Sequence, residues 1–161
     1  IMFEKFGEMN SCEEINELAQ NLFNEGDMDS VRIMAKENGI PEDYAEMYLE
    51  GTIPELCDQL IAATGQLDME SQELKLKGLM SDWVEYIKGL CMESDLMARK
   101  VRQKGKNLKS CMAVLLKYSF SNRAAVDKEI VKKAGISNAR VEFGIPGMAE
   151  AKIMIKEYYL K

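Results

Sequence analysis

The chain has 161 residues, 47% hydrophobic and 30% charged, a composition typical of one soluble globular domain with at most a short appendage. No apolar run approaches the roughly 18 residues that span a bilayer, and the first residues lack the pattern of a signal peptide. We therefore expect a cytoplasmic protein without a membrane segment. The sequence has no histidine, which removes the commonest general base and metal ligand.

Helical patterns dominate the first half of the chain. Ser11 and Glu14 have the spacing of a capping box, and apolar residues follow them at helical spacing. Two further segments begin at a proline and end at a glycine, which is the usual asymmetry of helix ends. The strongest pattern surrounds Trp83, which lies in a broad apolar stripe and is expected to be buried. We expect these helices over residues 11–23, 28–38, 41–50, 54–65 and 77–91.

The second half continues in the same way. Ser94 and Asn107 are good N-cap residues, and glycines separate the segments that follow them. We expect further helices over residues 94–103, 107–119, 126–135 and 148–161. The predicted fold is mostly α, a compact bundle of about seven to nine short helices with at most a minor strand pair near 139–145.

Charge divides the chain unevenly. Residues 1–98 contain 22 acidic and 6 basic side chains, whereas residues 99–161 contain 5 acidic and 15 basic ones. We therefore distinguish an acidic helical region, 1–93, from a basic helical region, 94–161, and expect both to belong to one compact unit. Such asymmetry indicates charged partners, unless the two halves neutralise each other within the fold.

A basic run marks the start of the second region. Residues 97–111 hold six cationic side chains and no acid. Several lie near the expected N-terminal end of a helix, where cations are unfavourable, so an anionic partner explains them better than local stability does. Nucleic-acid phosphate and an acidic protein surface both fit, and a merely solvated face remains the alternative. The candidate binding residues, of which both arginines are expected to point away from the core, are Arg99, Lys100, Arg102, Lys104, Lys106 and Lys109.

An acidic face is expected on the helix over 41–50. The segment resembles a helix-turn-helix, but its second helix would present carboxylates to DNA, which argues against DNA reading. A plain solvated helix pair is one interpretation. The other is a functional face that imitates nucleic-acid phosphates in a basic groove of another protein. The candidate residues are Glu42, Asp43, Glu46 and Glu50.

No pattern indicates catalysis. The sequence has no glycine-rich phosphate loop, and its acidic pairs lie on charge-rich faces. The four cysteines are too widely spaced for a zinc site, so we expect each to be a reduced core residue. We therefore expect a protein that is not an enzyme, with no catalytic residue, metal or cofactor.

The C-terminal third resembles the PcfK-like family of bacterial mobile elements. The resemblance covers roughly residues 95–161 and rests on "GKNLKSCMAVLLKYSF", "VDKEIVKKAG" and "IKEYYLK". Some relatives in this grouping are anti-CRISPR proteins that inhibit the type II RNA-guided nuclease Cas-nine. The resemblance implies a cytoplasmic inhibitor in a bacterial host that binds the nuclease with its guide RNA and blocks DNA engagement.

Two other functions stay open at this point. A conjugation or relaxosome accessory protein would contact DNA through its basic half, including residues 99–109. A small structural partner would touch no nucleic acid. A homodimer is compatible with each of the three.

Overall fold

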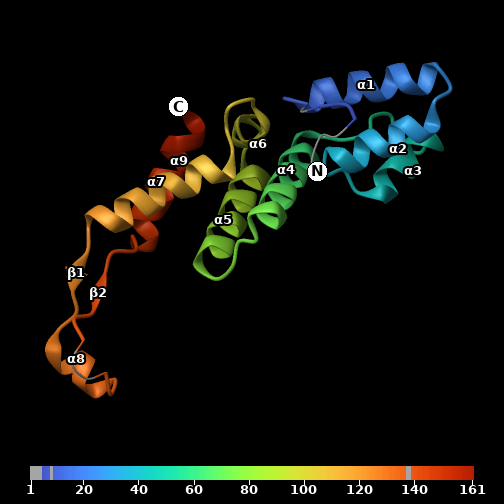
Figure 1. Cartoon of the computed structure of the whole chain (residues 1–161). Helices are drawn as coiled ribbons and strands as arrows, with labels where there is room; N and C mark the ends of the chain where they lie inside the picture. The colour runs from blue at the N-terminus through green and yellow to red at the C-terminus, as the bar shows by residue number, and fades with distance from the viewer. Residues whose placement is uncertain (1–4, 8, 137–138) are drawn as a thin grey trace. The chain divides into compact units, whose positions relative to one another are not determined.

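The computed structural model describes residues 5–7, 9–136 and 139–161. These residues form nine helices and one two-stranded antiparallel sheet, which confirms the expected mostly α fold (Figure 1). None of the helices described is long and apolar enough to cross a membrane. The chain divides into two units, Ile1–Leu108 and Lys109–Lys161, and each is described by itself. This boundary lies beyond the 93/94 division suggested by composition.

Three helices open the first unit, α1 (Cys12–Asn24), α2 (Met28–Glu37) and α3 (Glu42–Leu49). The predicted cap of α1 is confirmed, because the Ser11 hydroxyl accepts a hydrogen bond from the Glu14 N–H at 3.1 Å. Asp27 caps α2 in the same way through the Ser30 N–H. The apolar faces of α1 and α2 meet in one core, whose members include Ile15, Ala19, Leu22, Val31, Met34 and Ala35.

The rest of the unit consists of α4 (Gln59–Leu74), α5 (Leu79–Glu93) and α6 (Asp95–Arg102), which pack on one another. The expected helix over 54–65 is wrong at both ends. Its N-cap is Asp58, whose carboxylate accepts the Ile61 N–H at 2.8 Å, and the helix continues past Gly65. Trp83 of α5 is 3% exposed, as predicted.

Gly65 lies inside α4 at a point where the backbone of another segment approaches too closely for any larger residue. A Cβ on Gly65 would lie 2.6 Å from the carbonyl oxygen of Gly39, and a Cβ on Gly39 would lie 2.5 Å from that of Gly65. Gly39 ends α2 with a φ of +74°, which favours glycine on its own account. The α2–α3 turn and α4 therefore approach backbone to backbone.

Two glycine substitutions test this contact. Gly65→Ala should destabilise the protein by about 1–3 kcal/mol, because the new methyl group meets backbone atoms that cannot rotate away. Gly89→Ala is the matched control, since it also lies inside a helix but a Cβ there meets nothing within 4 Å. That change should stabilise the protein by about 0.5–1 kcal/mol through helix propensity. Urea unfolding of both variants measures the difference, and equal midpoints would contradict the close approach.

Arg102, at the end of α6, is buried in the first unit. Its side chain is 2% exposed. Its Nε donates to the carbonyl oxygen of Met9 at 2.9 Å, and its Nη1 donates to those of Asn38 and Ala62 at 3.1 Å each. Its Nη2 donates to the side-chain oxygen of Asn38. One guanidinium thus joins α6, α4, the end of α2 and the segment before α1.

The second unit contains most of α7 (Leu108–Ser121) and then β1 (Ala124–Ala125), α8 (Lys128–Lys133), β2 (Glu142–Phe143) and α9 (Met148–Leu160). Strand β2 lies in the predicted range, whereas its antiparallel partner β1 was not predicted. In α9, Ile155 and Tyr159 are buried, whereas Met148 and Lys152 are exposed. Desolvation and the nearby Glu150 carboxylate of α9 raise the pKa of Tyr118 in α7.

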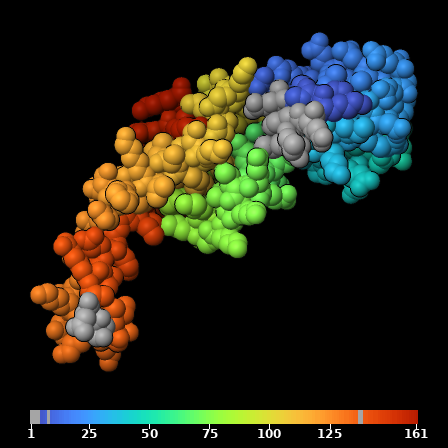
Figure 2. Space-filling model, in the orientation of Figure 1, coloured from blue at the N-terminus to red at the C-terminus, as the bar shows by residue number. Residues whose placement is uncertain are grey.

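Residues 123–145, which we call the arm, comprise β1, α8 and β2 (Figure 1). Within the part of the arm that the structure describes, no residue is buried. Figure 2 shows its atoms as a projection beyond α7. The arm is held by backbone pairing and by a close contact at its base, where a Cβ on Gly144 would overlap the carbonyl oxygen of Ser119.

Candidate interaction surfaces

The basic run does not form one continuous cationic surface. The expectation that Arg102 faces away from the core is wrong. Its side chain is buried, and its guanidinium donates hydrogen bonds to the carbonyl oxygens of Asn38 and Ala62. Arg99 is exposed but forms an ion pair with Glu13 of α1, at 2.7 Å between Nη1 and Oε1. Both arginines therefore contribute to the fold. The four lysines of the run remain at least partly exposed: Lys100, Lys104, Lys106 and Lys109.

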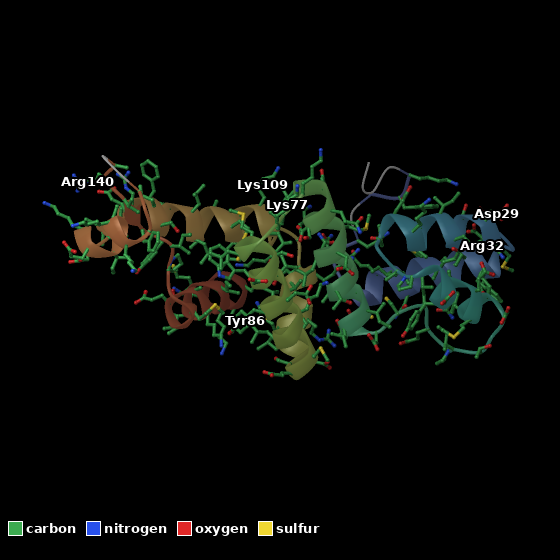
Figure 3. All side chains as sticks on the ribbon, turned by 90° about the horizontal axis from the view of Figure 1, so that it is seen from below. Asp29, Arg32, Lys77, Tyr86, Lys109 and Arg140 are labelled. Carbon is green, nitrogen blue, oxygen red and sulfur yellow. The ribbon has the colours of Figure 1, made fainter. Side chains whose placement is uncertain are left out.

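The acidic face of α3 keeps three exposed carboxylates, those of Glu42, Asp43 and Glu50. Glu46 is engaged, since its two oxygens accept from Nε and Nη2 of Arg32 at 2.6 and 3.3 Å. That hydrogen bonding lowers the pKa of Glu46. Arg32 also pairs with Asp29 at 3.1 Å, and Figure 3 shows these two residues beside each other on α2. The acidic face therefore presents three exposed carboxylates instead of the four expected from the sequence.

A concave acidic surface that the sequence did not reveal lies between α1 and the segment before α4. We call it the acidic groove; its volume is about 530 Å³. Glu17 of α1 and Glu55 of the loop are exposed on it, and neither has an ion pair among the residues described. The groove is lined by Cys12, Glu13, Asn16, Glu17, Gln20, Tyr48, Pro54, Glu55, Asp58 and Gln59.

Glu13 is one of the carboxylates that line the acidic groove. Hydrogen bonding to its own backbone N–H at the start of α1 lowers its pKa, and Arg99 and Gln59 act in the same direction. Gln59 donates to the same oxygen as Arg99, at 2.7 Å. Glu13 is thus ionised and held in place at neutral pH. Carboxylates and amides on a concave surface suit a guanidinium or ammonium group of a partner.

The arm and the adjoining end of α7 carry a different kind of surface, which is basic and aromatic. Phe143 in β2 is 70% exposed, and Phe120 at the end of α7 is 69% exposed. The guanidinium of Arg123 lies 4.7 Å from the centre of the Phe120 ring. Arg140 and Arg123 share one acid, Glu142, at 2.9 and 3.9 Å. Exposed aromatic rings beside cations are the groups that bind single-stranded nucleic acid.

All four cysteines are free and buried, as predicted. Over the described residues, the structure contains no group of three or more His, Cys, Asp or Glu side chains that could hold a metal ion. Comparisons with protein-family models, with curated proteins and with solved structures find no match to the chain. The interaction surfaces must therefore be interpreted from their own chemistry.

Proposed function

We propose that the chain is a binding protein that inhibits a bacterial RNA-guided DNA nuclease of the Cas-nine type. The observation that carries the proposal is the acidic groove, a concave surface whose carboxylates Glu17 and Glu55 form no ion pair with any residue that the structure describes. Such a nuclease holds its guide heteroduplex and DNA in strongly positive channels. The resemblance of residues 95–161 to PcfK-like proteins supports the same class of partner.

The net charge of the first unit supports binding to a cationic surface of the nuclease. The first unit contains 22 acidic and 11 basic residues, so its field attracts a cationic partner. The groove would receive an arginine or lysine side chain from the channel wall, and the exposed acids of α3 would replace phosphates nearby. DNA would then be excluded because its binding surface is occupied. The exposed lysines of the basic run would contact guide-RNA phosphate or an acidic patch of the same nuclease.

A charge-reversed pair tests the proposal. Glu17→Lys with Glu55→Lys places two cations in the groove, and like charges at an interface cost several kcal/mol. Affinity for guide-loaded nuclease should fall about tenfold or more, with a parallel loss of inhibition in a DNA-cleavage assay. The matched control is Glu25→Lys with Glu73→Lys, because these exposed acids lie outside the groove and their reversal changes the net charge equally.

The control should retain the affinity of the wild type, measured by biolayer interferometry at physiological salt. Thermal melting of both variants verifies that each is folded. Equal losses in the two variants would assign the effect to net charge and would reject the groove as the docking site. Failure of the wild type to bind guide-loaded or guide-free nuclease would reject the proposed function itself.

A DNA-binding accessory protein of a mobile element is the second candidate, and the arm is the observation that favours it. The second unit has 10 basic and 5 acidic residues, and the arm adds exposed phenylalanine to this charge. The same experiment distinguishes the candidates. An accessory protein binds bare DNA with an affinity that falls steeply with salt, and the Glu17→Lys, Glu55→Lys variant would bind DNA more strongly than the wild type.

A further inference from the structure

Two buried cysteines from distant parts of the sequence are in contact, and one of them, Cys12, lines the acidic groove. Cys12 is the first residue of α1, and Cys57 immediately precedes Asp58, the N-cap of α4. Their Sγ atoms are 3.8 Å apart. We propose that Cys12 and Cys57 form an oxidation site at which hydrogen peroxide joins the two thiols in a reversible disulfide.

The surrounding hydrogen bonds hold the two sulfur atoms in this arrangement. The Asn16 amide group donates to the Cys57 carbonyl oxygen at 2.9 Å, and its oxygen accepts the Cys57 N–H at 3.0 Å. The same amide nitrogen lies 3.4 Å from the Sγ of Cys12. Asn16 thus fixes the backbone of one cysteine while it contacts the sulfur of the other. To form a disulfide, the two sulfur atoms must approach from 3.8 Å to roughly 2.0 Å.

The environment shifts the pKa values of the two thiols in opposite directions. The hydrogen bond from the Cys57 thiol lowers the pKa of Cys12, whereas the pKa of Cys57 is raised by that bond and by burial. Burial and, to a smaller extent, the carboxylates of Glu13, Glu55 and Asp58 oppose the ionisation of Cys12, but the hydrogen bond from Cys57 outweighs them. Cys12 is 4% exposed and is one of the residues that line the groove, the side from which a small oxidant would approach.

The reaction balances in two steps. The Cys12 thiolate attacks one oxygen of hydrogen peroxide, the O–O bond breaks, and Cys12 becomes a sulfenic acid as hydroxide leaves. The Cys57 sulfur then attacks the sulfenic sulfur, forming the S–S bond and releasing hydroxide, which the Cys57 proton converts to water. The two thiols lose two electrons in total, and peroxide is reduced to two waters.

Cysteine counting on the full chain tests this proposal. After peroxide treatment, the unfolded wild type should show two alkylatable thiols where the reduced protein shows four, and dithiothreitol should restore the other two. A peptide map without reductant should contain a cross-link between the Cys12 and Cys57 peptides. The double variant Cys91→Ala with Cys111→Ala is the control, because it removes the other buried thiols and should form the same cross-link.

Four unchanged thiols in the treated wild type would overturn the proposal. So would a cross-link through Cys91 or Cys111, or a sulfinic acid on Cys12 beside a reduced Cys57. The wild-type measurement is decisive even if a cysteine variant fails to fold. The result is also independent of the proposed nuclease partner, since the cross-link is formed and detected in the purified chain alone.

Discussion

Replacement of Arg102 by methionine is expected to lower the free energy of unfolding by about 3–5 kcal/mol, an effect of the size found when one side of a buried charged network is removed. The guanidinium donates to three backbone carbonyl oxygens and to the Asn38 side chain, all within the first unit. Methionine fills a similar volume but donates nothing. Buried acceptors without a donor then bear their full desolvation cost.

Two companion variants separate this role from charge alone. Lys104→Met removes a cation from the same basic run at an exposed position and should change stability by less than about 0.5 kcal/mol. Arg102→Lys keeps the charge but loses the planar fork, so it should recover only part of the stability. Chemical denaturation followed by circular dichroism measures all three. An Arg102→Met variant as stable as Lys104→Met would contradict the buried position.

Trp83→Ala is expected to cost a similar amount, about 3–5 kcal/mol, through the cavity it leaves in the face of α5. Trp83 is the only tryptophan in the chain and is buried, so its fluorescence should have a short emission maximum that shifts to longer wavelength on unfolding. Met92→Ala is the control on the same helix, because Met92 is 72% exposed and should cost little. Native emission at the wavelength of free indole would contradict the burial.

The sequence predicted the features that depend on neighbours along the chain. Helix caps such as Ser11, Asp58 and Ser94 act over three residues, and a capping side chain can be recognised from local spacing. Ser11 and Ser94 were predicted on that basis. The cap at Asp58 was missed because Pro54 and Gly65 imitate the two ends of a helix.

Features that depend on distant segments could not be predicted in this way. Gly65 resembles a helix stop until Gly39 is placed against it, and Arg102 resembles a surface cation until the carbonyl oxygens around it are known. The same limit applies to the candidate surfaces. The acids of α3 are neighbours in sequence and were predicted, whereas Glu17 and Glu55 meet only through the packing of α1 on the loop before α4.

The absence of buried side chains in the described part of the arm has a consequence for how this region can change over generations. A substitution in a packed core is filtered by stability, because most changes there cost 2–5 kcal/mol against a total of about 5–15. Substitutions of Phe143, Ile145 and their exposed neighbours in the arm do not carry that cost in stability, because these side chains are not packed in a core. Mutations can therefore accumulate in the arm while α7 and α9 stay folded, which allows a new binding specificity to arise without a compensating change elsewhere.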